Sequence, residues 1–452
     1  MGAVVEVEVI RGELDALASA LAEERFRHVA GLEPAPALAR LFRAHGRAAH
    51  RETAAALAAA GEPELGARVA ALRVERVQAE REEAWREGEA AAAGQGPDGP
   101  LPLGAAQLAQ TRERDRERRL AFGRAALDAA AQPAREAAVE ERARARGEAG
   151  LVPDWERVVE ADALLSATDD GYREVLAWAA RHEADLAPAP AGDLGRADLL
   201  FVLAARRYEA LFPRGLLALA LGRTAEPLRL PLGRVRVDDG DRPAQWPGAH
   251  ALGPRVSLRR QGGAADWLGL FGAVGQALAS AAVPPHRLHP AAPFTFGALL
   301  SGLLLDRGFL AARLDVERRQ APDVARALAL RELFRLRAAA AALRVATEVE
   351  RGLSGAAWRE AHREALSRAA LASWPGGLAA RDGDSDRLAA QLAGAARAEV
   401  LRRGLVERCD EDWWKNPRAA DVLGGWLAAG GAWAEEEPKP RLGGEALVKR
   451  LE

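Results

Sequence analysis

The sequence of 452 residues contains very little of several residue types that support cross-linking or metal binding. Cys409 is its only cysteine, which excludes an internal disulfide and any zinc site built from cysteines. Lysine occurs only at Lys415, Lys439 and Lys449, so arginine supplies the other 60 of the 63 basic residues. The formal net charge is -2, and this near balance gives no electrostatic reason to expect binding to nucleic acid or to an anionic membrane.

Common catalytic motifs and targeting signals are missing as well. No GxSxG or Walker A motif occurs, so the sequence gives no support for the enzyme classes that those motifs mark. The first residues include Glu6, Glu8 and Glu13 and lack a basic start, which predicts a cytoplasmic location rather than secretion. The apolar stretches 267–283 and 293–305 end before they reach a confident spanning length, and we interpret them as buried helices without membrane association.

Residues that favour helix make up most of what remains. Alanine, leucine, arginine and glutamate dominate, and all four have high helix propensity. We therefore predict a mainly α fold with a small sheet in the middle of the chain, at about 228–260. We divide the chain into an N-terminal helical region, 1–150, and a helical domain, 151–452, in which helices at about 265–310 follow the sheet.

Short segments interrupt the helical pattern. Ala3–Ile10, Leu228–Val237 and Arg255–Arg260 are strand candidates, the first two because apolar residues alternate along them. Glycine and proline in Gly94–Gly104 predict a turn-rich loop, and Pro188–Gly195 is a predicted linker.

A long, heavily charged helix is predicted over much of Ala105–Gly147. Its run Thr111–Arg119 reads TRERDRERR, in which acids alternate with arginines. This alternation is typical of a solvated helix face with ion pairs between neighbouring turns, and it disfavours a basic binding strip.

The most informative segment is Val237–Leu310. An Asp-rich run leads into WPGAHAL, the strand candidate RVSLRR and the apolar helix DWLGLFGAVGQALAS. A loop rich in proline and histidine follows, and then a second helix that reads PFTFGALLSGLLL. This order resembles the core of the M3 family of zinc metallopeptidases, the group of thimet oligopeptidase and oligoendopeptidase F.

The resemblance implies a multi-helix peptidase-like fold with a defined metal site. In that family the first helix carries F-H-E-x-G-H-A, and a later helix supplies a glutamate in an E-x-x-S setting. Two histidines at i and i+4 lie on one helix face and bind one zinc, and the glutamate between them is the general base for the metal-bound water. The glutamate of the later helix completes three protein ligands and leaves the fourth position for water.

This sequence retains the framework of the motif but not its chemistry. Phe271, Gly275 and Ala277 match the framing residues. The positions of the first histidine, the general base, the second histidine and the third ligand are occupied by Gly272, Ala273, Gln276 and Ala298. Glycine and alanine offer no side-chain donor and glutamine is a poor zinc ligand, so the substitutions predict a catalytically inactive protein with no metal and no cofactor.

The third-ligand position depends on the alignment of the second helix. Ala298 takes it if Ser301 corresponds to the serine of the family, and Gly297 takes it if the register shifts by one. The catalytic tyrosines that follow the third ligand in the family also have no counterpart, because Tyr172 and Tyr208 both precede the motif.

A peptidase-like cleft without catalytic groups could still bind a peptide or a protein partner. The candidates that the resemblance places in this cleft are Gly248, Ala249, His250, Ser257 and Gln276. We expect Arg255–Arg260 to be an edge strand that pairs with an extended peptide, with a preference for acidic peptides from its arginines. The sequence predicts no nucleic-acid partner and does not define the oligomeric state.

Two other functions remain open, namely an enzyme that uses different residues and a purely structural helical scaffold. His250, or His286 and His289 with a metal, could serve such an enzyme, but we predict a loop pair without a metal because no carboxylate is nearby. We interpret the DDGD run at 238–241 as a turn after a strand rather than a calcium loop. The tryptophans in 410–417 (DEDWWKNP) are predicted to lie in the core rather than on a docking surface.

Overall fold

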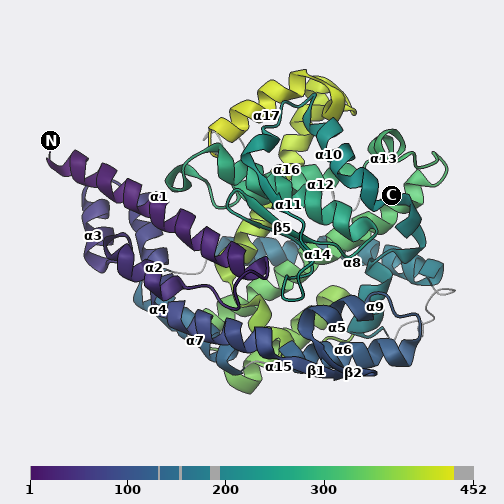
Figure 1. Ribbon diagram of the computed structural model, residues 1–452, viewed down its shortest axis with the longest axis horizontal. Helices are drawn as coiled ribbons and strands as arrows, with labels where there is room; N and C mark the ends of the chain where they lie inside the picture. The colour runs from purple at the N-terminus through teal and green to yellow at the C-terminus, as the bar shows by residue number, and fades with distance from the viewer. Residues whose placement is uncertain (1, 131–132, 152–154, 184–193, 432–452) are drawn as a thin grey trace.

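The computed structural model describes residues 2–130, 133–151, 155–183 and 194–431 (Figure 1). Its secondary structure is mostly helical with few strands, so the predicted mainly α fold is confirmed. The predicted linker 188–195 lies almost entirely outside the described residues.

The first part of the chain folds into helices that are joined at one point by a short hairpin. In Figure 1 these elements form the left and lower side of the molecule. Their bounds are α1 Gly2–Val29, α2 Leu38–Ala44, α3 Arg51–Ala59, α4 Pro63–Ala91, β1 Ala93–Gly96, β2 Gly99–Pro102, α5 Leu103–Gln110, α6 Arg116–Ala130 and α7 Pro133–Glu148.

The remaining elements surround a small sheet. The helices are α8 Trp155–Glu183, α9 Arg196–Leu203, α10 Leu217–Ala225, α11 Ala264–Ala282, α12 Ala292–Ser301, α13 Arg307–Leu314, α14 Ala321–Glu350, α15 Gly355–Ala370, α16 Ser385–Cys409 and α17 Arg418–Ala428. The strands are β3 Arg236–Asp238, β4 Gly248–Leu252 and β5 Arg255–Arg259. Since α7 contacts α14 and α1 contacts β4, the first part lies directly against the rest, and a boundary at residue 150 stays a prediction.

The sheet has the strand order β3-β5-β4. β4 and β5 form an antiparallel hairpin in which His250 lies opposite Ser257, and β3 pairs with β5 in parallel. The prediction that Arg255–Arg260 is an edge strand is therefore wrong, because β5 has a strand on each side. Within the described residues β3 and β4 each have a strand neighbour on one side only, so they are the two edge strands of the sheet.

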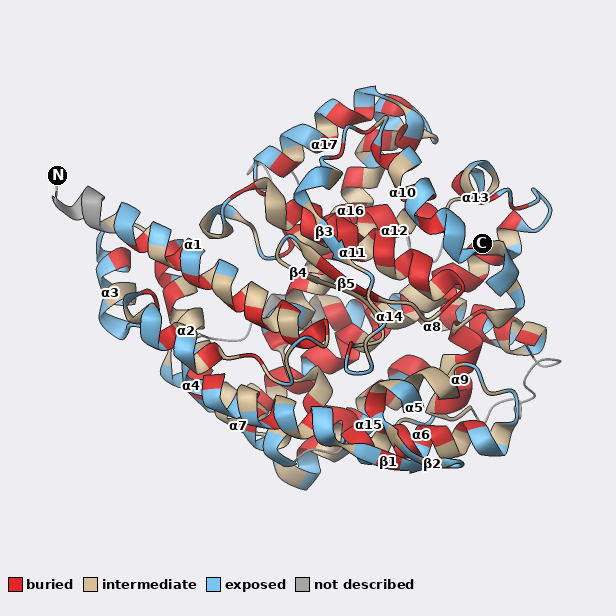
Figure 2. Cartoon of the chain, in the orientation of Figure 1, coloured by how far each residue is buried: buried red, intermediate tan, exposed pale blue. Residues whose placement is uncertain are grey.

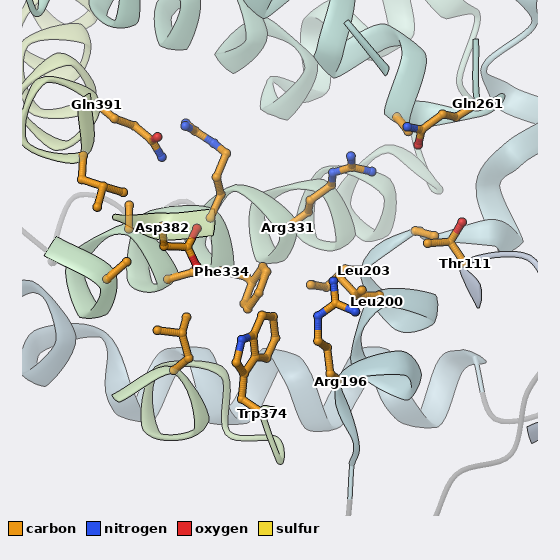
Figure 3. Close-up of a pocket in the computed structure, with 18 of the residues that line it drawn as sticks. Thr111, Arg196, Leu200, Leu203, Gln261, Arg331, Phe334, Trp374, Asp382 and Gln391 are labelled. Carbon is orange, nitrogen blue, oxygen red and sulfur yellow. The ribbon is translucent and has the colours of Figure 1, made fainter. Parts of the chain in front are cut away.

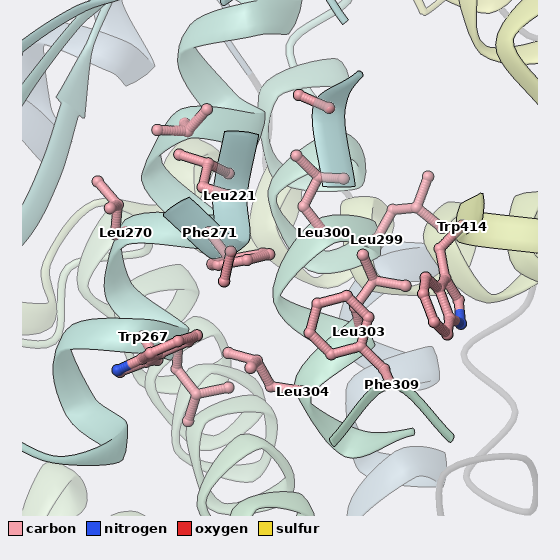
Figure 4. Close-up of a cluster of buried hydrophobic side chains, with 14 of the residues drawn as sticks. Leu221, Trp267, Leu270, Phe271, Leu299, Leu300, Leu303, Leu304, Phe309 and Trp414 are labelled. Carbon is pink, nitrogen blue, oxygen red and sulfur yellow. The ribbon is translucent and has the colours of Figure 1, made fainter. Parts of the chain in front are cut away.

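The largest hydrophobic core cluster is centred on α11 and α12. Trp267 and Phe271 of α11 stack with 6.3 Å between ring centroids, and Phe271 meets Phe309 edge to face at 5.9 Å. Figure 4 shows these rings together with the leucines of α12 and with Trp414. The buried colouring of both helices in Figure 2 confirms that the apolar stretches are core helices. Trp413 and Trp414 are 3% and 2% exposed, which confirms the core interpretation of 410–417.

The helices of the described residues are too short or too polar to cross a membrane singly. No single helix among them is long and apolar enough to cross a bilayer. One bent pair, 292–305 with 307–314 at 76°, meets the length and composition criteria only when its two helices are taken together.

Several local predictions need correction. Ala3–Ile10 is part of α1 and not a strand, since Ile10, Leu14 and Leu17 continue the segment with buried residues at helical spacing. Gly94–Gly104 forms the β1–β2 hairpin rather than an irregular loop. Of Leu228–Val237, only its end contributes to β3.

The predicted long helix over Ala105–Gly147 is divided into α5, α6 and α7. Its charged run is not uniformly solvated, because Arg119 is 0% exposed. Its guanidinium donates to the carboxylate of Asp198 at 2.7 Å, so a residue 79 positions away in the sequence determines its environment.

Candidate functional site

One face of α11 is less buried than the rest of the helix. From Ala265 to Ser280 the only partly exposed positions are Ala265, Gly269, Gly272, Gln276 and Ser280, and all others are buried. The spacings of four, three, four and four residues place these positions on a single stripe. The two predicted histidine positions, Gly272 and Gln276, therefore lie on this stripe, whereas Ala273 is 3% exposed and belongs to the core.

α11 and α12 approach each other closely through glycines. A Cβ atom on Gly275 would lie 2.5 Å from the carbonyl oxygen of Phe296, and a Cβ on Gly297 would lie 2.8 Å from Cγ of Gln276. Real side chains do not tolerate such distances, so both positions require glycine for this helix contact. The contact fills the space between the two helices with backbone atoms.

Gly297 and Ala298, the two candidates for the third-ligand position, have different surroundings. Gly297 faces α11, since its virtual Cβ lies 2.9 Å from the carbonyl oxygen of Gly272. Ala298 instead lines a small cavity of about 50 Å³ together with Ser301. Ser301 is close to α11 as well, because its Cβ lies 3.7 Å from a Cβ built on Gly272. The register alternative, Gly297, is thus the residue that stands directly opposite Gly272 and Gln276.

The strand candidates for the cleft have different environments. Gly248, Ala249 and His250 are partly exposed on β4, and Ala249 packs against Gly269 of α11. Ser257 does not line a cleft, because it is 0% exposed and its hydroxyl accepts a hydrogen bond from Gln245 at 2.9 Å.

The imidazole of His250 contacts the residues that precede β4. Its Nε2 lies 3.0 Å from the carbonyl oxygen of Pro247, and its ring meets Trp246 edge to face. Burial lowers the pKa of His250 and the guanidinium groups of Arg387 and Arg86 lower it further, which outweighs the hydrogen bond to Pro247. His250 therefore favours the neutral form.

The arginines of β5 and the loop after it are already paired. Arg255 contacts Glu23 of α1 at 2.5 Å, Arg259 contacts Asp241 at 3.2 Å and Arg260 contacts Asp239 at 3.1 Å. The expectation that these arginines select acidic peptides is not supported, because local carboxylates neutralise them. The DDGD run begins at the last residue of β3 and continues as irregular chain, in which the carboxylate of Asp238 accepts from the backbone N–H of Gly240 at 3.0 Å.

His286 and His289 point to different partners. His286 contacts the carboxylate of Asp15 in α1 at 2.7 Å, so a carboxylate that is distant in the sequence does lie next to this histidine. His289 lies 2.9 Å from Arg397 of α16. Among the described residues no group of three His, Cys, Asp or Glu side chains is arranged to hold a metal ion.

A much larger cavity of about 440 Å³ lies next to these elements (Figure 3). It extends between α9, the loop that precedes α11, α14, Trp374 and the start of α16. None of the predicted cleft candidates lines it, but Gln261 does, and a Cβ on Gly248 would lie 3.2 Å from Nε2 of Gln261. The start of β4 therefore adjoins the cavity.

A buried carboxylate holds the loop at the cavity wall. Asp266 of α11 is 2% exposed and accepts hydrogen bonds from the backbone N–H of Gln261 at 2.6 Å and of Gly262 at 3.0 Å. The carbonyl of Gln261 accepts from Arg112. These contacts hold the backbone of Gln261 at the cavity wall.

The cavity is lined by five arginines and one aspartate. The lining residues with charge are Arg196, Arg206, Arg331, Arg335, Arg387 and Asp382. In Figure 3 the side chains of Arg196 and Arg331 extend toward the cavity, and Trp374 and Phe334 lie beside each other in its wall with ring centroids 5.9 Å apart. Burial lowers the pKa of Arg196 to about 10 and also lowers the pKa of Arg331.

Comparison with known proteins gives information at the level of structure only. No family model matches the sequence, and no curated protein matches it. PZ peptidase A with inhibitor 2 has a TM-score of 0.59 at 11% identity, and the match covers 98% of this chain and 80% of that one. A putative oligoendopeptidase F has a TM-score of 0.58 at 12% identity with the same coverage. Metallocarboxypeptidase 1 of Trypanosoma cruzi has a TM-score of 0.50 at 12% identity, and the match covers 98% of this chain and 95% of that one.

The chain has an oligoendopeptidase F-like peptidase fold. Identities this low establish the fold and leave activity open. The fold raises the question of a zinc ion, and the residues at the expected place do not fit one. Gly272, Gln276 and Gly297 or Ala298 supply neither imidazole nor carboxylate, and the glycine contact between α11 and α12 leaves no room for a longer side chain at Gly297.

No sequence pattern predicts the arginine-lined cavity in this peptidase-like fold. Arg196, Arg331 and Arg387 belong to a set of 60 arginines and carry no local motif that distinguishes them. The only local feature that could have indicated a buried position for Arg331 is its apolar sequence neighbours, Leu330 and Leu333, which are themselves buried.

Proposed function

We propose that this chain is a non-catalytic peptidase-like protein that binds an extended peptide along β4. The proposal rests chiefly on the partly exposed stripe of α11, which carries Gly272 and Gln276 where a zinc peptidase needs two histidines. Ala273 cannot accept a proton in place of a general base. The fold supplies the frame of a peptidase, and the side chains supply no group for hydrolysis at this place.

The edge of β4 supports the binding half of the proposal. An antiparallel edge strand directs alternate backbone N–H and C=O groups away from its partner, and an extended peptide can pair with them. All five residues of β4 are partly exposed. α1 covers the turn of the hairpin, where Ala22 packs on Gly253, so the accessible part of the edge is its beginning at Gly248.

The catalytic half is tested by metal analysis and a hydrolysis assay. We expect purified protein to contain far less than one zinc per chain and to leave quenched fluorescent peptides of six to twelve residues intact, with or without a chelator. Stoichiometric zinc together with hydrolysis that a chelator blocks would contradict the proposal and favour an enzyme that uses other residues.

The binding half is tested with a pair of labelled peptides that have identical side chains. In the second peptide, alternate backbone amides are N-methylated, which removes the donors needed for strand pairing. We expect fluorescence anisotropy to show at least a roughly tenfold loss of affinity for the methylated peptide, because several backbone hydrogen bonds are lost. Equal affinity would exclude pairing with β4, and no binding of any peptide would favour a structural scaffold.

A further inference from the structure

Three arginines of the 440 Å³ cavity have no carboxylate of their own. Arg206 pairs with Glu209 at 2.9 Å, and Arg335 pairs with Glu332 at 3.0 Å. Among the described residues the side chains of Arg331 and Arg387 have no hydrogen bond or ion pair. Arg196 donates to a neutral amide, that of Gln110, at 3.3 Å.

The aspartate of the cavity compensates these charges only in part, because it favours the charged form of Arg196 without forming an ion pair with it and is hydrogen-bonded elsewhere. Asp382 lies 3.0 Å from Nε2 of His362, a histidine that is 1% exposed. Arg196 rests on the ring of Trp374, with 5.2 Å from the guanidinium carbon to the ring centroid. The cavity therefore combines an excess of positive charge with an aromatic wall.

Burial desolvates the guanidinium groups of Arg196 and Arg331, whereas Arg387 is exposed at the cavity rim. Desolvated guanidinium groups are costly without an anion, and their planar donors match carboxylates well. Arg331 lies on α14, and burial lowers its pKa; Glu332 favours its charge, whereas Arg206 and Arg335 oppose it. A bound anion would remove the cost.

We propose that the cavity binds the carboxylate groups of an acidic peptide, with Arg196, Arg331 and Arg387 as the recognising side chains. This inference rests on the proposed function, since the peptide that pairs with β4 is the one whose acidic end enters the cavity. The start of β4 at Gly248 adjoins Gln261 in the cavity wall, so a peptide on this edge leads directly into it. The volume lies in the range of ligand-binding pockets, roughly 300–1,000 Å³.

The inference is tested with two labelled peptides of equal length. The first contains alternating glutamates and a free C-terminus, and the second contains glutamine at the same positions and a C-terminal amide. We expect the acidic peptide to bind at least about tenfold more tightly, with a preference that shrinks as salt concentration rises. The double variant Arg331→Met and Arg387→Met should lose the preference and keep the affinity for the neutral peptide.

The double variant Arg318→Met and Arg319→Met is the matched control. Both arginines are exposed and lie outside the cavity, and their replacement removes the same two positive charges. This variant should keep the full preference for the acidic peptide. Circular dichroism of all three proteins checks that they are folded, and the double variant is chosen because neither side chain has a structural partner to lose.

The outcomes separate this inference from the proposed function. Equal binding of both peptides to the unchanged protein would overturn the inference while peptide binding itself stands. Failure of both peptides to bind would overturn the proposed function. Inorganic phosphate that binds with the same dependence on Arg331 and Arg387, without any preference between the peptides, would overturn the inference in favour of a small-anion site.

Discussion

α14 carries two arginines, six residues apart, whose surroundings differ completely. Arg337 is 0% exposed, and its guanidinium donates to the carbonyl oxygens of Ala369 and Leu165, to the hydroxyl of Thr168 and to the carboxylate of Asp169. Arg331 faces the cavity without a hydrogen bond or an ion pair to any described residue. The same helix thus holds one arginine that is fully satisfied by the fold and one that is not.

This difference separates structural arginines from candidate ligand-binding arginines. A buried charge stabilises a fold only when its partners replace the water it has lost. Arg337, like Arg119, has such partners from distant helices. Arg331 forms no hydrogen bond or ion pair with the described part of the chain, so a ligand accounts for its place in the cavity better than stability does.

The largest effect is expected from Arg337→Met. The substitution removes the donor shared by Thr168, Asp169 and two carbonyl groups, and it also removes the contact of the guanidinium with the ring of Tyr172 at 4.7 Å. We expect the free energy of unfolding to fall by about 4 kcal/mol. Urea denaturation followed by circular dichroism measures the change.

Arg344→Met is the control on the same helix. Arg344 is 54% exposed in its side chain and lies 3.8 Å from Asp162 of α8. Exposed pairs of this kind contribute up to about 1 kcal/mol, so the change should be much smaller. Similar losses for the two variants would show that the network around Arg337 does not stabilise the fold.

A smaller loss is expected from Asp198→Asn, which tests the second structural arginine. Asp198 is 1% exposed and accepts from Arg119 at 2.7 Å and from Arg116 at 3.0 Å. The amide keeps the shape but leaves Arg119 with only carbonyl acceptors, so we expect a loss of about 2 kcal/mol in unfolding free energy. Asp170→Asn, at a fully exposed carboxylate, should change it by less than about 0.5 kcal/mol. An equal change in both variants would remove the distinction between buried and exposed pairs.

The sequence predicted those features that depend on local pattern. Helix-favouring composition gave the fold class, and the order of motifs located α11 and α12 with Gly272 and Gln276 on one face. The features it did not predict depend on contacts between distant residues. Arg337 and its partner Leu165 are 172 positions apart, and nothing local distinguishes Arg337 from Arg331.

The sheet shows the same limit. The strand candidate Arg255–Arg260 located β5 correctly, but which strands form the edges depends on β3, a strand of three residues that pairs across 19 positions. The identity of the third-ligand position likewise depended on helix packing, since only the approach of α11 to α12 shows that Gly297 rather than Ala298 faces Gly272.

Arg331→Met should change the unfolding free energy less than Arg337→Met or Asp198→Asn, and with the opposite sign. Methionine has a similar length and removes a charge whose desolvation outweighs the attraction of Glu332, so we expect the unfolding free energy to rise by about 1 kcal/mol. The chemical change is identical to that in Arg337→Met, and only the surroundings differ. Urea denaturation in the absence of ligand measures it, and a loss as large as that of Arg337→Met would show that Arg331 is structural. A gain in stability together with weaker binding of the acidic peptide is the combination expected of a residue kept for its ligand, because functional sites commonly reduce the stability of the fold that holds them.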